Sequence, residues 1–407
     1  MHGDRVARWA RLFIAAVLAA FAIPRQAAAA EDAQWKTFSD AGKKAENAGR
    51  YAEAEWMYAS ALKVAEGFGP SDAKLGASLN NLGLICDRQA KYDQAEPLYK
   101  RALAIAEQAF GPDHPNVAVS LNNLAAHYDS QARYDQAEPL YKRSLAIREK
   151  ALGPDHPNVA ISLNNLAGLY RAQARYDQAE PLYQRSLAML EKALGPDHPS
   201  VATSLHNLAA LYVSQARFRQ AEPLYERSLA IREKALGPDH PDVAETLNNL
   251  GRLYYAQAKY DRAEPLYKRA LAIYEKALGP EHPSVAASLN NLAGIYRSQA
   301  AHEQAEVLYK RALAIREKAL GPDHPDVATS LNSLALLYYE QRRYAQAEPL
   351  LKRSLAIREK ALGPDHPDVA KSLENCASLL EMTGRTAEAE ELLKRAAAIR
   401  ARRGQKP

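Results

Sequence analysis

A five-residue segment that recurs every 42 residues constrains the fold of this chain more than any other feature. The text between successive copies nearly repeats itself, as residues 116–152 and 158–194 show. Units of this length stack so that each buries its apolar face against its neighbours, and the 407-residue length therefore measures the number of units and not of globular domains. The segment is GPDHP, or GPEHP in one copy, and begins at Gly111, Gly153, Gly195, Gly237, Gly279, Gly321 and Gly363.

Each unit contains two apolar stripes with helical spacing. Residues three and four apart lie on one face of an α-helix, so each stripe predicts one amphipathic helix. The joining segment, residues 131–133 in one copy, is short enough to make the two helices antiparallel. The first stripe consists of Leu121, Leu124, Ala125 and Tyr128, and the second consists of Ala137, Leu140, Tyr141, Ser144 and Leu145.

The sequence also indicates where the predicted helices begin and end. Pro115 suits the first position of a helix, and either Asp113 or His114 is placed to cap it. Gly111 and its equivalents are expected to end the preceding helix with a positive φ angle. Pro139 lies early in the second helix, where we expect it to remove one hydrogen bond and to bend or delay the first turn.

The units predict an all-α solenoid with about nine helix-turn-helix units. Eight similar units occupy residues 76–403, the last of them acting as a C-terminal cap, and residues 404–407 form a tail. A divergent unit with its linker occupies residues 31–75, because Ala54, Tyr58 and Ala61 follow Gly42 at the spacing found in the other copies.

This pattern of small and large residues resembles the tetratricopeptide (TPR) repeat across residues 35–403. The segments LNNLA, AEPLYKRAL and LGPDHPDVA are similar, more narrowly, to the 42-residue repeats of kinesin light chain. The resemblance implies a right-handed superhelix whose concave groove holds extended segments of partner proteins. It also implies that Asn residues of the LNNLA motif contact the bound peptide.

The N-terminus is typical of a secretory signal peptide, predicted over residues 1–30. Three arginines precede an apolar run at residues 12–23, and four alanines at 27–30 precede Glu31. The run is short for the roughly 20 residues that span a bilayer, so cleavage after Ala29 or Ala30 is favoured over an uncleaved anchor. We therefore expect an exported protein, periplasmic or secreted, without an integral membrane segment after cleavage.

Charge and cysteine content restrict the partners and the chemistry. Residues 1–30 carry four arginines and one aspartate, a net +3, which leaves +2 of the formal +5 for the remainder. This small excess argues against nucleic acid as a partner. Cys86 and Cys376 lie seven repeats apart, beyond the ~7 Å reach of a disulfide, and each stands at a core position.

The strongest candidate binding residues are the asparagine pairs of the LNNLA motif. An amide side chain offers donors and an acceptor, so a ladder of amides can hold a peptide backbone whatever its side chains. The alternative is that the second Asn of each pair bonds a neighbouring helix. The candidates are Asn80, Asn81, Asn122, Asn123, Asn164, Asn165, Asn248, Asn249, Asn290, Asn291 and Asn332.

Variable positions farther along the same helix are the candidates for specificity. Three arginines and two tyrosines gather in the middle repeats, at Arg171, Arg252, Arg297, Tyr255 and Tyr339. Such a surface favours an extended, mildly acidic peptide with an aromatic or large apolar residue. The alternative is ordinary solvated surface. Acidic residues mark the two ends of the groove, at Asp87, Asp129, Glu374 and Glu381.

Catalytic and metal-binding interpretations find little support. The repeated stripe tyrosines, such as Tyr128 and Tyr212, are better explained by core packing than by ligand stacking. The repeated histidine of GPDHP is a turn residue whose copies lie too far apart to share a metal. No cofactor and no catalytic residue are expected. The sequence favours a non-enzymatic scaffold that binds proteins or peptides, and the alternative is a structural spacer or assembly subunit that uses its ends and convex face.

Overall fold

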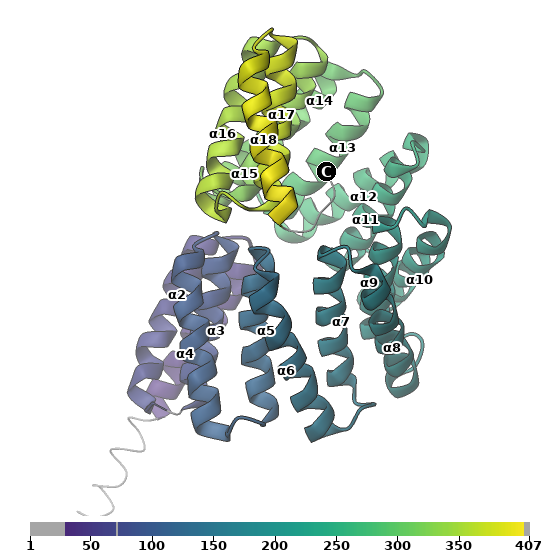
Figure 1. The fold of residues 1–407 in the computed structure, drawn as a ribbon. Coiled ribbons are helices and arrows are strands. Elements are labelled where there is room, and N and C mark those ends of the chain that lie inside the picture. Colours follow the sequence, from purple (N-terminus) through teal and green to yellow (C-terminus); the bar gives the residue numbers. More distant parts are fainter. Residues whose placement is uncertain (1–28, 71, 403–407) are drawn as a thin grey trace, which may run out of the picture.

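The computed structural model describes residues 29–70 and 72–402, and the predicted signal peptide lies almost entirely outside them. Within these residues the chain is all helical, and consecutive helices form nine antiparallel pairs that follow one another along a curved solenoid (Figure 1). Both the all-α fold class and the helix-turn-helix organisation are therefore confirmed.

The helices have nearly constant lengths along the chain. A helix over residues 29–47 pairs with α2 (Tyr51–Ala65), which a short 3-10 helix, η1 (Glu66–Phe68), follows. The first helices of the next eight pairs are α3 (Ala73–Arg88), α5 (Pro115–Ser130), α7 (Pro157–Ala172), α9 (Pro199–Ser214), α11 (Pro241–Ala256), α13 (Pro283–Ser298), α15 (Pro325–Glu340) and α17 (Pro367–Met382). Their second helices are α4 (Tyr92–Phe110), α6 (Tyr134–Leu152), α8 (Tyr176–Leu194), α10 (Phe218–Leu236), α12 (Tyr260–Leu278), α14 (His302–Leu320), α16 (Tyr344–Leu362) and α18 (Thr386–Arg402).

The turn between units is built by residues of the GPDHP segment. Gly153 has a φ of 88° and a ψ of 153°, a conformation essentially restricted to glycine. His156 is the N-cap residue of α7, and its Nδ1 accepts a hydrogen bond of 3.1 Å from the backbone N–H of Asn158. The predicted positive φ is thus confirmed, and the histidine rather than the aspartate caps the helix. Asp113 instead accepts a hydrogen bond from Lys150 of the next unit.

The turn inside each unit has a different conformation. Ala174 has a φ of 57°, the N–H of Arg175 reaches the carbonyl of Tyr170, and the N–H of Ala174 reaches that of Arg171. These bonds satisfy carbonyls at the end of α7 and send the chain back along the first helix. The expectation that proline delays the second helix is wrong, because α6 begins at Tyr134 and continues through the exposed Pro139.

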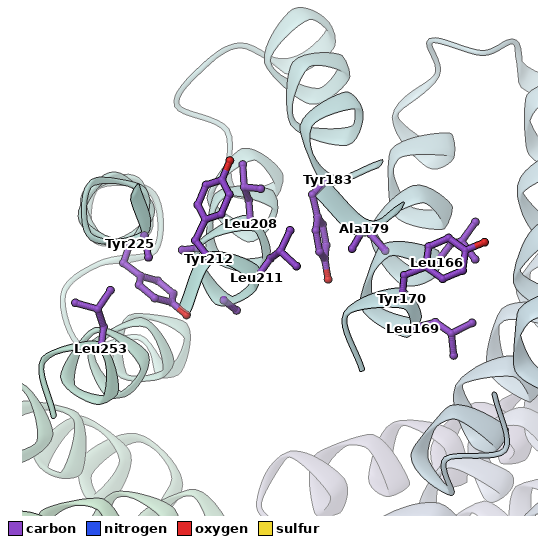
Figure 2. Packing of buried hydrophobic residues seen from close by; sticks show 14 of the residues in the cluster. Leu166, Leu169, Tyr170, Ala179, Tyr183, Leu208, Leu211, Tyr212, Tyr225 and Leu253 are labelled. Atoms are coloured by element: carbon purple, nitrogen blue, oxygen red, sulfur yellow. The ribbon is translucent and has the colours of Figure 1, made fainter. Parts of the chain in front are cut away.

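The core runs through the solenoid between the helix layers. Tyr183 and Tyr225 of the second helices pack among leucines of the first helices, such as Leu211 and Leu253 (Figure 2). Both cysteines are buried and free. No helix in the described residues is long and apolar enough to cross a membrane.

The solenoid curves until its two halves touch. The helices α13–α18 lie above α2–α6 in Figure 1. Nε2 of His324, before α15, lies 3.2 Å from the carbonyl oxygen of Arg88 at the end of α3. Gly49 lies so close to His282 that a Cβ atom there would stand 2.7 Å from the imidazole ring. We call these two contacts the seam.

Candidate peptide-binding face

The first helices form the inner side of the curve. Consecutive first helices, such as α7 and α9 or α9 and α11, contact one another more closely than consecutive second helices do. This difference is expected on a bent stack, where the inner side is compressed. The predicted asparagines and the variable charged and aromatic positions all lie on these first helices. We call their solvent-facing side the inner face.

The stripe tyrosines hold neighbouring units together. Tyr212 is 7% exposed, and its hydroxyl donates a hydrogen bond of 2.9 Å to Glu180 of the preceding unit. Arg217 pairs with Glu180 at 2.6 Å, and its guanidinium carbon lies 4.3 Å from the centroid of the Tyr212 ring. The same three-residue contact joins other units, as Tyr170 with Glu138 and Arg175 shows. The core interpretation of these tyrosines is therefore confirmed.

The first asparagine of each pair points toward the junction between units. Nδ2 of Asn248 donates a hydrogen bond of 2.8 Å to Ser288, and Oδ1 of Asn164 accepts one of 3.3 Å from Ser204. Asn332 accepts a bond of 2.7 Å from Asn375. Four of these amide oxygens are buried without a partner within the described residues, those of Asn80, Asn122, Asn248 and Asn290. These amides serve the junctions at least as much as the inner face.

The second asparagine of most pairs is free for a ligand. These side chains are half-buried, and the described part of the chain offers them no hydrogen bond. Asn249 differs, because its Nδ2 lies 3.1 Å from the backbone carbonyl of Glu245 and 3.1 Å from Nε2 of His206. The amides without a partner are those of Asn81, Asn123, Asn165 and Asn291.

The three candidate arginines differ in their surroundings. Arg252 is exposed and has no ion pair among the described residues. Arg171 is half-buried, and its Nε has no hydrogen-bond partner there. Arg297 forms an ion pair with Glu340 at 3.7 Å, a distance too long for a hydrogen bond. The middle of the inner face thus carries positive charge that the protein only partly neutralises.

The ends of the inner face carry less free negative charge than the sequence predicts. Asp87 lies 2.7 Å from Nδ1 of the buried His127, and Glu374 makes two hydrogen bonds of 2.7 Å with Arg400. Burial raises the pKa of Asp129 to about 6, although Arg171 opposes the shift. Glu381 alone of these four carboxylates is exposed at its position.

The two candidate tyrosines are half-buried and lie beside other aromatic rings. Tyr255 and Tyr260 have ring centroids 5.5 Å apart, and Tyr339 and Tyr344 have centroids 5.7 Å apart. The hydroxyl of Tyr255 lies 3.0 Å from Oγ of Ser298 in the next unit. Each ring is therefore packed against a neighbouring ring while part of the residue stays exposed.

Two kinds of residue with a role at the inner side escaped the sequence analysis. His206 stands where other units have the first asparagine, and burial lowers the pKa of its imidazole to about 4. A buried arginine near the end of several second helices, such as Arg148, crosses into the next unit to reach Ser162. When the units are aligned, His replaces the first asparagine at position 206, and the position of Arg148 holds Arg, Leu, Tyr or Ala in different units. These two changes were the signals available in the sequence.

Comparison with known proteins agrees with this geometry. A family model described as "Tetratricopeptide repeat" matches in overlapping segments that together run from residue 45 to residue 402. The chain belongs to the tetratricopeptide repeat family. TPR proteins are generally non-enzymatic scaffolds. No curated protein matches the chain.

Solved structures similar to this TPR chain include a "putative kinesin light chain" with nearly identical TPR-like repeats from Podosopora anserina. It is 32% identical, with 50% of this chain and 97% of that chain covered and a TM-score of 0.42. BtubC (BKLC) from P. vanneervenii is 25% identical over 57% of this chain and 91% of its own, with a TM-score of 0.45. The expected resemblance to kinesin light chain repeats is confirmed by these matches. A Rap protein complexed with competence and sporulation factor shares the fold, at 14% identity over 91% of this chain and 98% of that chain, with a TM-score of 0.58.

Proposed function

We propose that this TPR protein is a non-enzymatic scaffold that holds an extended segment of a partner protein along its inner face. The observation that carries the proposal is the series of second asparagines whose amides have no partner within the described residues. Successive amides on neighbouring helices can bond successive backbone groups of an extended peptide. A Rap protein of the same fold was solved in complex with competence and sporulation factor, which supports a ligand-binding use of such a superhelix.

The central charges favour a mildly acidic segment with an aromatic or large apolar residue. Arg171 and Arg252 have no carboxylate within ion-pair distance in the described residues, so a ligand carboxylate would not have to displace one. Tyr255, on the same helix as Arg252, and Tyr339, on α15, supply flat apolar contact area. Each exposed ion pair contributes only about 0.2 to 1 kcal/mol, so affinity arises from many contacts.

The experiment combines peptide selection with charge reversal. We expect a random peptide library to yield acidic sequences, and added salt to weaken their binding. Changing Arg171, Arg252 and Arg297 together to Glu should weaken a selected peptide at least tenfold. Arg219→Glu is a control, because Arg219 is exposed on α10 and has no ion pair among the described residues. Selection of basic peptides, or a triple variant with unchanged affinity, would contradict the proposal.

The rival function, a spacer or assembly subunit, predicts a different result in the same assay. A spacer would retain a folded partner or a second copy of itself, and the library would yield no peptide. Affinity purification of the protein from its own envelope distinguishes these outcomes by identifying what is retained.

We also propose that the protein is exported, on the basis of the residue succession at 1–30. Mass spectrometry of protein from its native host should show a chain beginning at Ala30 or Glu31. A cytoplasmic chain that retains Met1 would refute export without affecting the proposed binding of peptides.

A further inference from the structure

A buried arginine fills the same place at four junctions of the solenoid. Arg148 is 8% exposed, and its Nη1 donates to the carbonyl of Asn158 at 3.1 Å and to Oγ of Ser162 at 2.9 Å. Equivalent bonds ten and fourteen residues ahead join Arg232, Arg316 and Arg358 to the next unit. Arg232 also pairs with Glu245 at 2.9 Å, but Arg148 has no carboxylate within ion-pair distance in the described residues, so this fold accommodates a guanidinium there with neutral acceptors alone.

The junction between α4 and α5 has the acceptors without the arginine. Ala106 stands at the arginine position and leaves a cavity of about 170 Å³. Ser120, the equivalent of Ser162, is 4% exposed, lines the cavity and has no hydrogen-bond partner among the described residues. Oδ1 of Asn80, which lines the cavity from α3, is also buried without a partner. Two possible acceptors without a hydrogen-bond partner thus line this space.

The other junctions without this arginine are filled in other ways. Leu190 packs into one of them, and Ser204 there bonds Asn164. Tyr274 occupies another, where Asn248 donates to Ser288. Among these described junctions, the one at Ala106 therefore leaves both the space and the hydroxyl unoccupied.

We propose that the cavity beside Ala106 binds the guanidinium of an arginine side chain supplied by a partner. Its acceptors are Ser120 and the carbonyl of Asn116, the equivalents of the two groups that Arg148 bonds, together with Oδ1 of Asn80, whose equivalent Asn122 is not bonded to Arg148. Ile105 and Phe110 supply apolar walls for the methylene stem. An engineered cavity of roughly 150 Å³ holds benzene, so a planar guanidinium fits this volume.

The place of this cavity suits an anchor for the proposed ligand. Ala77 and Val119 at its rim are exposed on the first helices α3 and α5. An arginine of a segment lying on the inner face would enter between them. This role as an anchor rests on the proposed function, whereas binding of a guanidinium by the cavity does not.

The direct test uses ethylguanidinium and the full chain. Saturation-transfer NMR should detect binding of ethylguanidinium, and ethylurea, its neutral counterpart, should bind at least fivefold more weakly. Ala106→Arg should fill the cavity from within, abolish the signal and raise the melting temperature, and Ala106→Leu should abolish the signal without supplying a donor. Ser120→Ala should weaken binding about fivefold, as expected for one lost hydrogen bond.

Ser162→Ala is the matched control, because its hydroxyl is already bonded to Arg148, and it should leave ethylguanidinium binding unchanged. Equal binding of ethylurea, or an unchanged signal in Ala106→Arg, would overturn the assignment. The anchor role is measured separately with selected peptides that carry arginine or citrulline at one position. If the triple reversal of the inner-face arginines leaves peptide affinity intact while Ala106→Arg abolishes ethylguanidinium binding, the proposed function fails and the guanidinium site stands.

Discussion

Nε2 of His324 lies 3.2 Å from the carbonyl oxygen of Arg88, a residue 236 positions away in the chain. Nδ1 of the same ring accepts a hydrogen bond of 3.1 Å from the N–H of Asp326. The ring must therefore be neutral, with its proton on Nε2, to cap α15 and hold the seam together.

This arrangement predicts a seam that opens in acid. Burial lowers the pKa of His324, opposed by Asp326 and by the hydrogen bond to the carbonyl of Arg88 and assisted by Arg316, and burial and Arg88 lower the pKa of His282. Because the closed form favours the neutral rings, closure is complete above the ordinary histidine pKa of about 6.5 and weakens as the pH falls below it. Small-angle X-ray scattering should show a larger radius of gyration at pH 5 than at pH 7.5.

The matching variant is His324→Asn, which keeps a capping side chain and loses the contact with Arg88. It should shift the seam toward the open form about fivefold at pH 7.5, as expected for one hydrogen bond. His156→Asn changes the same turn residue away from the seam and should leave the radius of gyration unchanged. A scattering profile that changes neither with pH nor in His324→Asn would show that the seam does not determine the shape.

His206 should make folding sensitive to pH in a separate way. Burial lowers its pKa to about 4, so the unfolded chain binds a proton more readily between pH 6.5 and 4. Stability from the neutral ring is present above pH 6.5 and falls with pH through that window. His206→Asn, the residue of the sister units, should remove about 2 to 3 kcal/mol of this loss at pH 4.5. Urea unfolding at pH 7.5 and 4.5 measures the difference, and equal losses in both proteins would contradict it.

The stripe tyrosines should matter far more to stability than the turn histidines. Tyr212→Ala should cost about 3 to 5 kcal/mol, because it deletes a buried aromatic ring and its contact with Glu180 and Arg217. His240→Ala removes only an N-cap and should cost about 1 kcal/mol. Thermal melts rank the stability of the two variants. A larger loss of stability from the histidine change would show that our assignment of the tyrosines to the core and the histidines to the turns is wrong.

Glycine should stabilise the turn between the two helices of a unit. Ala174 holds a φ of 57°, whereas the equivalent residue of the last unit, Gly384, has a φ of 77°. A side chain in this region costs about 1 to 2 kcal/mol, partly offset by the greater freedom of glycine in the unfolded chain. Ala174→Gly should therefore stabilise the protein by about 0.5 to 1 kcal/mol. Gly384→Ala should destabilise it by about as much, and opposite signs in urea unfolding would contradict this account.

The sequence predicted the repeat architecture well because each local signal recurs at the same place in every unit. Leu121, Leu124 and Tyr128 lie at helical spacing, and Pro115 begins the helix that contains them. The predicted delay of the second helix at Pro139 was wrong, because α6 already begins at Tyr134 and accommodates the proline inside it. The sequence predicted which positions belong to the candidate site. It did not predict which of their polar groups lack a hydrogen-bond partner. In the pair Asn248 and Asn249, the first asparagine bonds Ser288 of the next unit. Such a bond depends on which side chain of the next unit lies at the junction.

The sequence by itself determined that helices pair, that pairs stack and that tyrosines rather than histidines form the core, because these properties depend on contacts within one unit and its neighbour. Only the tertiary structure decided that Arg88 meets His324, that Asp87 is engaged by His127 and that Ala106 leaves a cavity. The seam depends on the small rotation between units summed over several repeats, and no local pattern encodes that sum. The cavity depends on how the three helices α3, α4 and α5 close around one missing side chain, so its acceptors and its volume appear only when the chain is packed.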